Sequence, residues 1–207
     1  MPYRETGNLA YKQLCLLWNS AIWRMTKIAH LVKMVEMKRL FPICLIGVGI
    51  LILLVSAGVW GYNQKVQHPS SAPLPDVVAD LDLTESLMAE RAITEFTRLH
   101  GDDFPITSGA VGMYGADHSA TLWVAGAPLQ PVAGRMLVAM RDKIASTAGR
   151  SPFSPVGERQ DGTRIVYELD GMGQKHFYFQ SGKMIVWLAV NPERAEEALT
   201  QVLKFYP

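Results

Sequence analysis

The sequence contains one long run without a charged residue, from Leu40 to Tyr62. As a helix rising about 1.5 Å per residue, this run would extend roughly 34 Å, which is enough to cross the ~30 Å hydrocarbon core of a bilayer. Only a helix satisfies all the backbone polar groups of a single segment inside lipid. We therefore expect a transmembrane signal-anchor helix over residues 40–62, and the rest of the chain divides into what lies on each side of it.

Two other interpretations of this run stay open. A buried core helix would be unusually long for an uncharged segment. A cleaved signal peptide is the second alternative, because Val55–Ala57 offers small residues for a peptidase and Lys38 and Arg39 precede the apolar run. The run continues through Trp60, further than the apolar part of a signal peptide normally extends, which favours an uncleaved anchor.

The distribution of charge predicts the orientation. Residues 1–39 carry seven basic and two acidic side chains, whereas the remainder carries 13 basic and 17 acidic ones. Basic flanks stay in the cytoplasm, so we expect the N-terminus inside and the C-terminal domain outside a cytoplasmic membrane. Trp60 and Tyr62 fit the aromatic belt at the outer interface of the bilayer. The lipid bilayer is therefore the first partner that we expect.

Residues 1–39 form a basic arm with helical periodicity. Apolar residues recur every three or four positions between Tyr11 and Met37, and most basic residues fall on the other side. The arm is expected to lie on the inner leaflet or to pair with a partner helix. An alternative is that the protein starts at Met37, because MKRLFPICLIG resembles the beginning of a signal-anchored protein.

Residues 63–81 are expected to be a mobile linker, since three prolines and two serines occur between Gln64 and Pro75. The extracytoplasmic domain then covers residues 82–207. The whole chain has a net charge of only +1, so it lacks the basic excess that would favour binding to nucleic acid. Both cysteines, Cys15 and Cys44, lie outside it, so it has no disulfide and no thiol chemistry.

The domain has the pattern of an α+β fold. Asp82 and Glu85 resemble a capping box, which predicts a first helix from there to His100. Two further helices are expected over residues 128–147 and 193–205, the last with Asn191 and Pro192 at its start. Strands are expected over 106–114, 120–127, 153–159, 164–169, 175–180 and 184–190. We therefore predict an antiparallel sheet of about six strands with helices packed on one face.

A weak internal repeat supports this arrangement. Shifting the chain by 64 residues aligns residues 113–128 with 177–192 and places Trp123 on Trp187. Both blocks lead into an expected helix, which suggests two β-β-α units joined by extra strands. If the repeat is structural, both tryptophans should face the same side of the sheet, each against the helix that follows its own hairpin.

The densest chemical feature is the aromatic run around His176. In a strand, His176 and Tyr178 share a face, and Tyr167 and Trp187 lie in the neighbouring expected strands. These four residues, His176, Tyr178, Tyr167 and Trp187, are the candidate ligand- or partner-binding surface. The alternative is that the rings only pack against one another, as aromatic strand residues commonly do.

No pattern fixes a reaction. The acidic and histidine residues His100, Asp102, Asp103, Asp117, His118 and His176 match no metal-site spacing. We expect no catalytic residue, no metal and no cofactor. The favoured function is a non-enzymatic, membrane-anchored extracytoplasmic binding or accessory domain, whose partner is another envelope protein or a small ligand. The alternatives are an envelope enzyme with a scattered active site, and a single-pass sensor that signals through its short cytoplasmic arm.

Overall fold

The computed structural model describes residues 42–100, 104–147 and 150–207. It contains a helix, Pro42–Gln67. The most apolar stretch of this helix has a mean hydropathy of 2.6, and no residue in that stretch is buried. By length and composition this helix is a candidate membrane span. It runs five residues past Tyr62, the end expected from the sequence. The predicted amphipathic arm lies outside the described residues.

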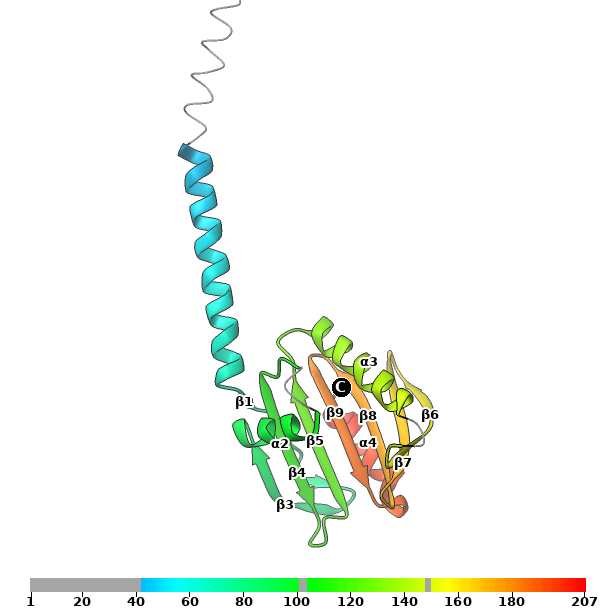
Figure 1. Ribbon diagram of the computed structural model, residues 1–207. Helices are drawn as coiled ribbons and strands as arrows, with labels where there is room; N and C mark the ends of the chain where they lie inside the picture. The colour runs from blue at the N-terminus through cyan, green and yellow to red at the C-terminus, as the bar shows by residue number, and fades with distance from the viewer. Residues whose placement is uncertain (1–41, 101–103, 148–149) are drawn as a thin grey trace, which may run out of the picture. The chain divides into compact units, whose positions relative to one another are not determined.

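The domain is built on a curled antiparallel sheet (Figure 1). Eight strands follow one another in the order β2-β3-β4-β5-β9-β8-β7-β6, and a two-residue strand, β1, pairs in parallel with β4. Their bounds are β1 Ser70–Ser71, β2 Val77–Val78, β3 Leu81–Met88, β4 Ser108–Tyr114, β5 Ala120–Gly126, β6 Phe153–Asp161, β7 Arg164–Gly171, β8 Gln174–Ser181 and β9 Met184–Val190. The mixed class and all six expected strands are confirmed, and the sheet is larger than expected because of β2 and β3.

The prediction of a helix starting at Asp82 is wrong. Residues Leu81–Met88 form β3, in which the leucines at 81, 83 and 87 are half-buried while the polar residues between them are exposed. Thr84 uses its hydroxyl to donate to the Met113 carbonyl, 3.0 Å away across the β3–β4 pair, rather than to cap a helix. Ala89 follows with a φ of 52° and turns the chain into α2, Glu90–His100.

Helices cover both faces of the sheet, which corrects the expectation of one covered face (Figure 1). Helices α2 and α3 (Gln130–Ser146) lie on one face, and α4 (Ala195–Phe205), which follows a 3-10 turn at Pro192–Arg194, lies on the other. The reason is visible in β9, MIVWLAV, whose side chains are apolar in both directions. A strand that is apolar on both faces requires a cover on each.

The segment expected to be a linker, residues 63–81, is part of the fold. Its first residues complete the Pro42–Gln67 helix, and Ser70 then donates its N–H to the Thr107 carbonyl at 3.0 Å. Ala72 is buried, and the carbonyls of Pro73 and Pro75 accept hydrogen bonds from buried tyrosine hydroxyls. Together with α4, this segment covers the second face of the sheet.

The predicted repeat is matched in the strands but not in the helices. Trp123 and Trp187 stand directly opposite each other in the β5–β9 pair and face the same side of the sheet. Trp123 packs with the α2 cluster and Trp187 with the α3 cluster, so each packs in a cluster other than that of the helix after its own hairpin. Helices α3 and α4, the two equivalent elements, lie on opposite faces, which is incompatible with a two-fold related pair of β-β-α units.

Candidate functional site

The structure brings the four predicted site residues together on the face covered by α3. Trp187, Tyr178 and Tyr167 occupy directly opposed positions on β9, β8 and β7. Their rings stack in series, with centroids 5.2 Å apart between Trp187 and Tyr178 and 4.8 Å apart between Tyr178 and Tyr167, each pair inclined by 15°. His176 lies one row along β8, where its ring meets the edge of Trp187 at 5.8 Å.

Hydrogen bonds fix the state of His176. The indole N–H of Trp187 donates to Nδ1 of His176 at 3.1 Å, and Nε2 lies 3.0 Å from the carbonyl oxygen of Gly171. Since a carbonyl only accepts, Nε2 carries the proton and the ring is neutral. Burial lowers the pKa of His176, opposed by the hydrogen bond to Gly171 and the charge of Asp170. Protonation of Nδ1 would break the bond to Trp187.

Most of this aromatic group is closed to solvent. His176, Tyr178 and Tyr167 are 4%, 2% and 8% exposed, and Leu137, Met140 and Ile144 of α3 pack against the group. Burial also raises the pKa of Tyr178 to about 12. Only Trp187 is half-buried. Packing of the domain therefore accounts for the three buried residues, and Tyr167 is the one of the four that also lines an open space.

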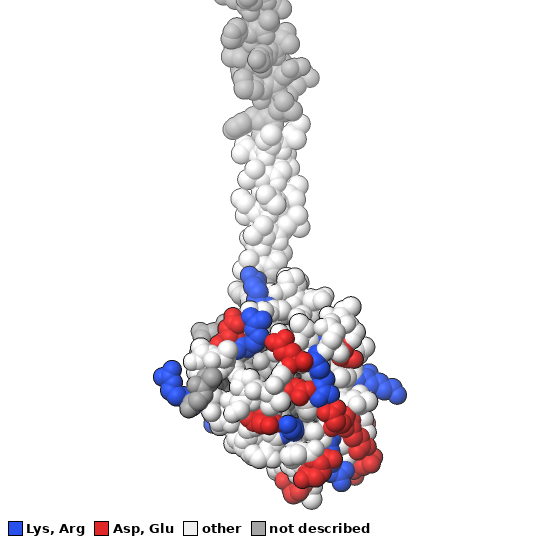
Figure 2. Space-filling view, turned by 90° about the vertical axis from the view of Figure 1, so that its right-hand side faces the viewer, with Lys and Arg blue, Asp and Glu red and all other residues white. Residues whose placement is uncertain are grey.

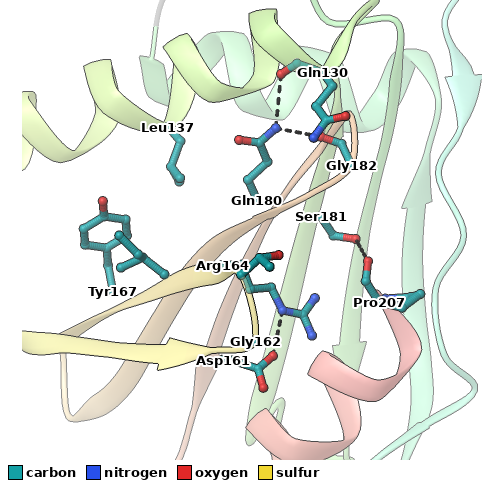
Figure 3. A pocket seen from close by; sticks show the side chains of 12 residues that line it. Gln130, Leu137, Asp161, Gly162, Arg164, Tyr167, Gln180, Ser181, Gly182 and Pro207 are labelled. Carbon is teal, nitrogen blue, oxygen red and sulfur yellow. Dashed lines mark hydrogen bonds and ion pairs between the residues drawn. The ribbon is translucent and has the colours of Figure 1, made fainter.

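That open space is a cavity of about 510 Å³ that the sequence did not indicate (Figure 3). Leu137 of α3, together with Ile165 and Tyr167 of β7, forms its apolar wall, and the polar lining includes Gln130 and Gln180. Figure 3 shows Leu137 and Tyr167 pointing toward the same space from the helix and the sheet. The cavity lies where the β6–β7 turn, the β8–β9 turn and the end of the chain meet.

Beside the cavity, the β7–β8 ladder covers only part of the two strands. Their ladder ends at Tyr167 opposite Tyr178, although β7 begins at Arg164 and β8 continues to Ser181. Arg164 holds the start of β7 toward α4. Its guanidinium donates to the carbonyls of Leu203, at 2.8 Å, and of Tyr206, both at the C-terminal end of that helix. Backbone carbonyls at a helix C-terminus are unpaired and attract cations.

Two further contacts around Arg164 keep it in place. Its Nε donates to a carboxylate oxygen of Asp161 at 2.7 Å, and its guanidinium carbon lies 5.1 Å from the centroid of the Phe179 ring. Cation–π contacts of this kind strengthen when they are shielded from water. The cationic side chain is thus shared among a carboxylate, two carbonyls and an aromatic face.

The opposite wall is fixed by Gln180 and Ser181. The amide nitrogen of Gln180 donates to the carbonyls of Gln130, at 3.1 Å, and Gly182, at 2.7 Å, which joins the β8–β9 turn to the start of α3. The hydroxyl of Ser181 donates to the backbone oxygen of Pro207 at 2.7 Å. The amide oxygen of Gln180 accepts no hydrogen bond from the described residues and points under α3 (Figure 3). The walls of the cavity are therefore held by hydrogen bonds, and the amide oxygen of Gln180 is an uncommitted acceptor beside it.

The remaining candidates for chemistry resolve into local structure. Ser119 donates through its hydroxyl and its N–H to the carboxylate of Asp117, which closes the β4–β5 turn and lowers the pKa of that carboxyl. Among the described residues no group of three or more histidine, cysteine or acidic side chains could hold a metal. Asp102 and Asp103, and the side chain of His100, fall outside the described residues.

Charge on the β6 side of the domain is mixed rather than concentrated. Figure 2 shows acidic and basic side chains interspersed over this face, whereas the surface of the Pro42–Gln67 helix is almost free of charge. Arg159 forms ion pairs with Glu168 of β7 and with Glu196 of α4, and so links these two elements at the surface. No single-signed surface on this side marks a nucleic-acid or polyanion site.

Comparison with known proteins adds no identification. No family model, no curated protein and no solved structure matches this chain. Function is therefore inferred from its own residues and contacts.

Proposed function

We propose that this chain is a single-pass protein of the cytoplasmic membrane whose C-terminal domain binds a ligand or partner on the outer side, without catalysing a reaction. The cavity under α3 carries this proposal. Its volume of about 510 Å³ lies within the range of roughly 300–1,000 Å³ that is usual for ligand sites. Walls held by side-chain-to-backbone hydrogen bonds reduce the ordering cost of binding.

The orientation is supported by the charges that flank the apolar helix. The basic excess lies before it, and the residues after it are weakly acidic in sum. The domain after the helix also contains no cysteine, so its stability does not depend on the redox state of the compartment. The distribution of charge supports a domain on the outer side of the membrane, and the lack of cysteine is compatible with either side.

The chemistry of the cavity supports binding rather than catalysis. The hydroxyl of Ser181 donates to the backbone oxygen of Pro207 instead of to a base, and the two charged side chains of the lining, Arg164 and Asp161, are paired with each other. Among the described residues that line it, none is a histidine or cysteine. General acid–base or nucleophilic catalysis requires an activated group within hydrogen-bond reach of the reacting atom, and no activated pair of a nucleophile and a base lines the described part of the cavity.

A photo-crosslinking comparison tests the proposal in native membranes. A benzophenone amino acid replaces Ile165, which lines the cavity and is 39% exposed, or Met172, which is 76% exposed at the other end of β7. The full-length protein should give a defined adduct after irradiation from position 165 and none from position 172. Equal adducts from both positions, or none from position 165, would refute binding at the cavity.

A further inference from the structure

We infer that the end of the domain at which the chain enters the sheet is a membrane-contact surface, which binds the headgroups of anionic phospholipids. This end, called the entry edge, carries Leu129, Lys183, Lys204 and Phe205, and none of these residues lines the cavity under α3. The inference rests on the proposed anchoring in a membrane and goes beyond the proposed ligand site. Its support comes from the place of the edge in the fold, its exposed apolar side chains and its charges.

The register of the sheet gives the position of the entry edge. Ser70 of β1 comes three residues after the Pro42–Gln67 helix, so the chain separates the two by no more than about 11 Å. One row of directly opposed residues crosses β1, β4, β5, β9 and β8: Ser70, Ser108, Gly126, Met184 and Ser181. The apolar helix thus tethers this edge of the sheet, rather than the opposite one, to the bilayer.

Exposed apolar side chains lie on both faces of the sheet at this edge. The start of α3 and the end of α4 meet the β8–β9 turn here, through the hydrogen bonds of Gln180 and Ser181. Leu129, directly before α3, is 63% exposed, and Phe205, the last residue of α4, is 42% exposed. Large apolar side chains next to basic ones are typical of surfaces that insert shallowly among lipid headgroups.

Three lysines at the entry edge have no counter-charge among the described residues. Lys183 lies in the β8–β9 turn, Lys204 in the last turn of α4 and Lys65 near the end of the apolar helix, and all three are exposed. None of them forms an ion pair with a described residue. Each lysine close to an anionic bilayer surface favours binding by about fivefold.

The other charges of the domain add to this asymmetry. At the entry edge Asp161 is paired with Arg164, and Glu90 is followed directly by Arg91. The opposite edge, where the β4–β5 and β7–β8 turns lie, has exposed acidic side chains: Asp80, Asp117, Asp170 and Glu193. An anionic lipid surface therefore attracts the entry edge and repels the opposite edge.

The test places the full-length chain, with isotope-labelled methionine methyl groups, in two kinds of nanodisc. One contains phosphatidylcholine alone and the other also contains phosphatidylglycerol, and both contain a trace of lipid with gadolinium on its headgroup. Gadolinium broadens the signals of nearby methyl groups. Met184 belongs to the row of the entry edge, and Met172, which is 76% exposed, lies in the turn at the opposite edge. Their signals are assigned by their loss in Met184→Leu and Met172→Leu.

Two charge-reversed variants extend the comparison. Lys183→Glu combined with Lys204→Glu reverses the charge of the entry edge. Lys143→Glu combined with Arg150→Glu changes the same amount of charge at exposed positions at and beyond the C-terminal end of α3, and is the matched control. The methyl signal of the buried Met136 shows that each variant is folded. The comparison of the two discs with the unaltered chain needs no variant.

The inference predicts that the Met184 methyl is broadened at least about twofold more in anionic discs than in neutral ones, while Met172 stays sharp in both. The difference should disappear in the Lys183→Glu, Lys204→Glu chain and persist in the control. Equal broadening of Met184 in the two discs overturns binding to anionic lipid, even for a chain that stays anchored. Stronger broadening of Met172, or equal responses of the two variants, overturns the assigned edge. The adduct from position 165 separately decides whether the cavity binds anything.

Discussion

The carbonyls of Pro73 and Pro75 connect the segment before the sheet to two buried tyrosines. Tyr206 donates its hydroxyl to Pro73 at 2.6 Å, and Tyr114 donates to Pro75 at 2.9 Å. Burial raises the pKa of both phenols, so both remain protonated donors at any ordinary pH. A fragment of residues 77–207 loses both acceptors, whereas a fragment of residues 68–207 keeps them.

The size of the effect follows from these contacts. Each hydrogen bond contributes about 1 kcal/mol, and the half-buried side chain of Leu74 adds about 1.5 kcal/mol more. With the backbone hydrogen bonds of Ser70 and Ala72 also lost, the shorter fragment should be less stable by roughly 5–6 kcal/mol. That is a large share of a total stability of about 5–15 kcal/mol.

The decisive result is that the stability cost of two substitutions depends on the length of the fragment. Tyr114→Phe and Tyr206→Phe should each cost about 1 kcal/mol in residues 68–207, and should be neutral or stabilising in residues 77–207, where the hydroxyls have no partner. Urea unfolding followed by far-UV circular dichroism at fixed pH and salt measures both series. Tyr178→Phe, whose hydroxyl does not contact the segment, is the control and should have equal effects in both fragments.

Equal costs of Tyr114→Phe and Tyr206→Phe in the two fragments would refute this reasoning. So would a fragment of residues 77–207 as stable as residues 68–207, because residues 68–76 would then be a linker without a structural role.

Three further predictions concern pH, the central tryptophans and orientation. Because the pKa of His176 is lowered on folding, the unfolded chain binds more protons below its ordinary pKa of about 6.5, so stability should fall as pH drops from 7 toward the folded-state pKa; His176→Gln should flatten this part of the pH profile in urea unfolding. Trp123→Ala and Trp187→Ala should each lower the free energy of unfolding by about 2–4 kcal/mol, and a neutral Trp187→Ala would contradict its role in the stack. Alkaline phosphatase fused after Pro207 should be active and a fluorescent protein that matures only in the cytoplasm should stay dark; the opposite pattern would reverse the orientation.

The strands after residue 104 could be predicted because their turns carry local signals. Gly162, Gly173 and Gly182 have φ values of 59°, 80° and 54°, as two-residue hairpin turns require. β3 was missed because the Asp82–Glu85 pair imitates a helix cap, while its three leucines alternate weakly. The second covered face had a signal in the two-sided apolar pattern of β9, which only buried strands show.

The cavity and the role of the segment before β2 had no such signal. Arg164 reaches carbonyls 39 and 42 positions away, and Tyr206 reaches Pro73 across 133 positions. Neither pairing leaves a local pattern in the sequence, because an arginine or a tyrosine looks the same whether it is bound to solvent or to a distant carbonyl. The structure brings the predicted aromatic residues together. Their expected cross-strand register was compatible with both a buried stack and an exposed binding surface, so the sequence could not distinguish the two.

Hydrogen exchange in native membranes tests the binding function of the cavity most directly. The chain is extracted by a polymer that keeps its surrounding membrane, and backbone exchange of residues 161–165 and 180–182, which line the cavity, is compared with that of detergent-purified protein. A ligand in the cavity should slow exchange in these two segments and leave residues 184–190 of β9 unchanged. Identical exchange of residues 161–165 and 180–182 in both preparations would contradict the proposal that this cavity is occupied in the membrane.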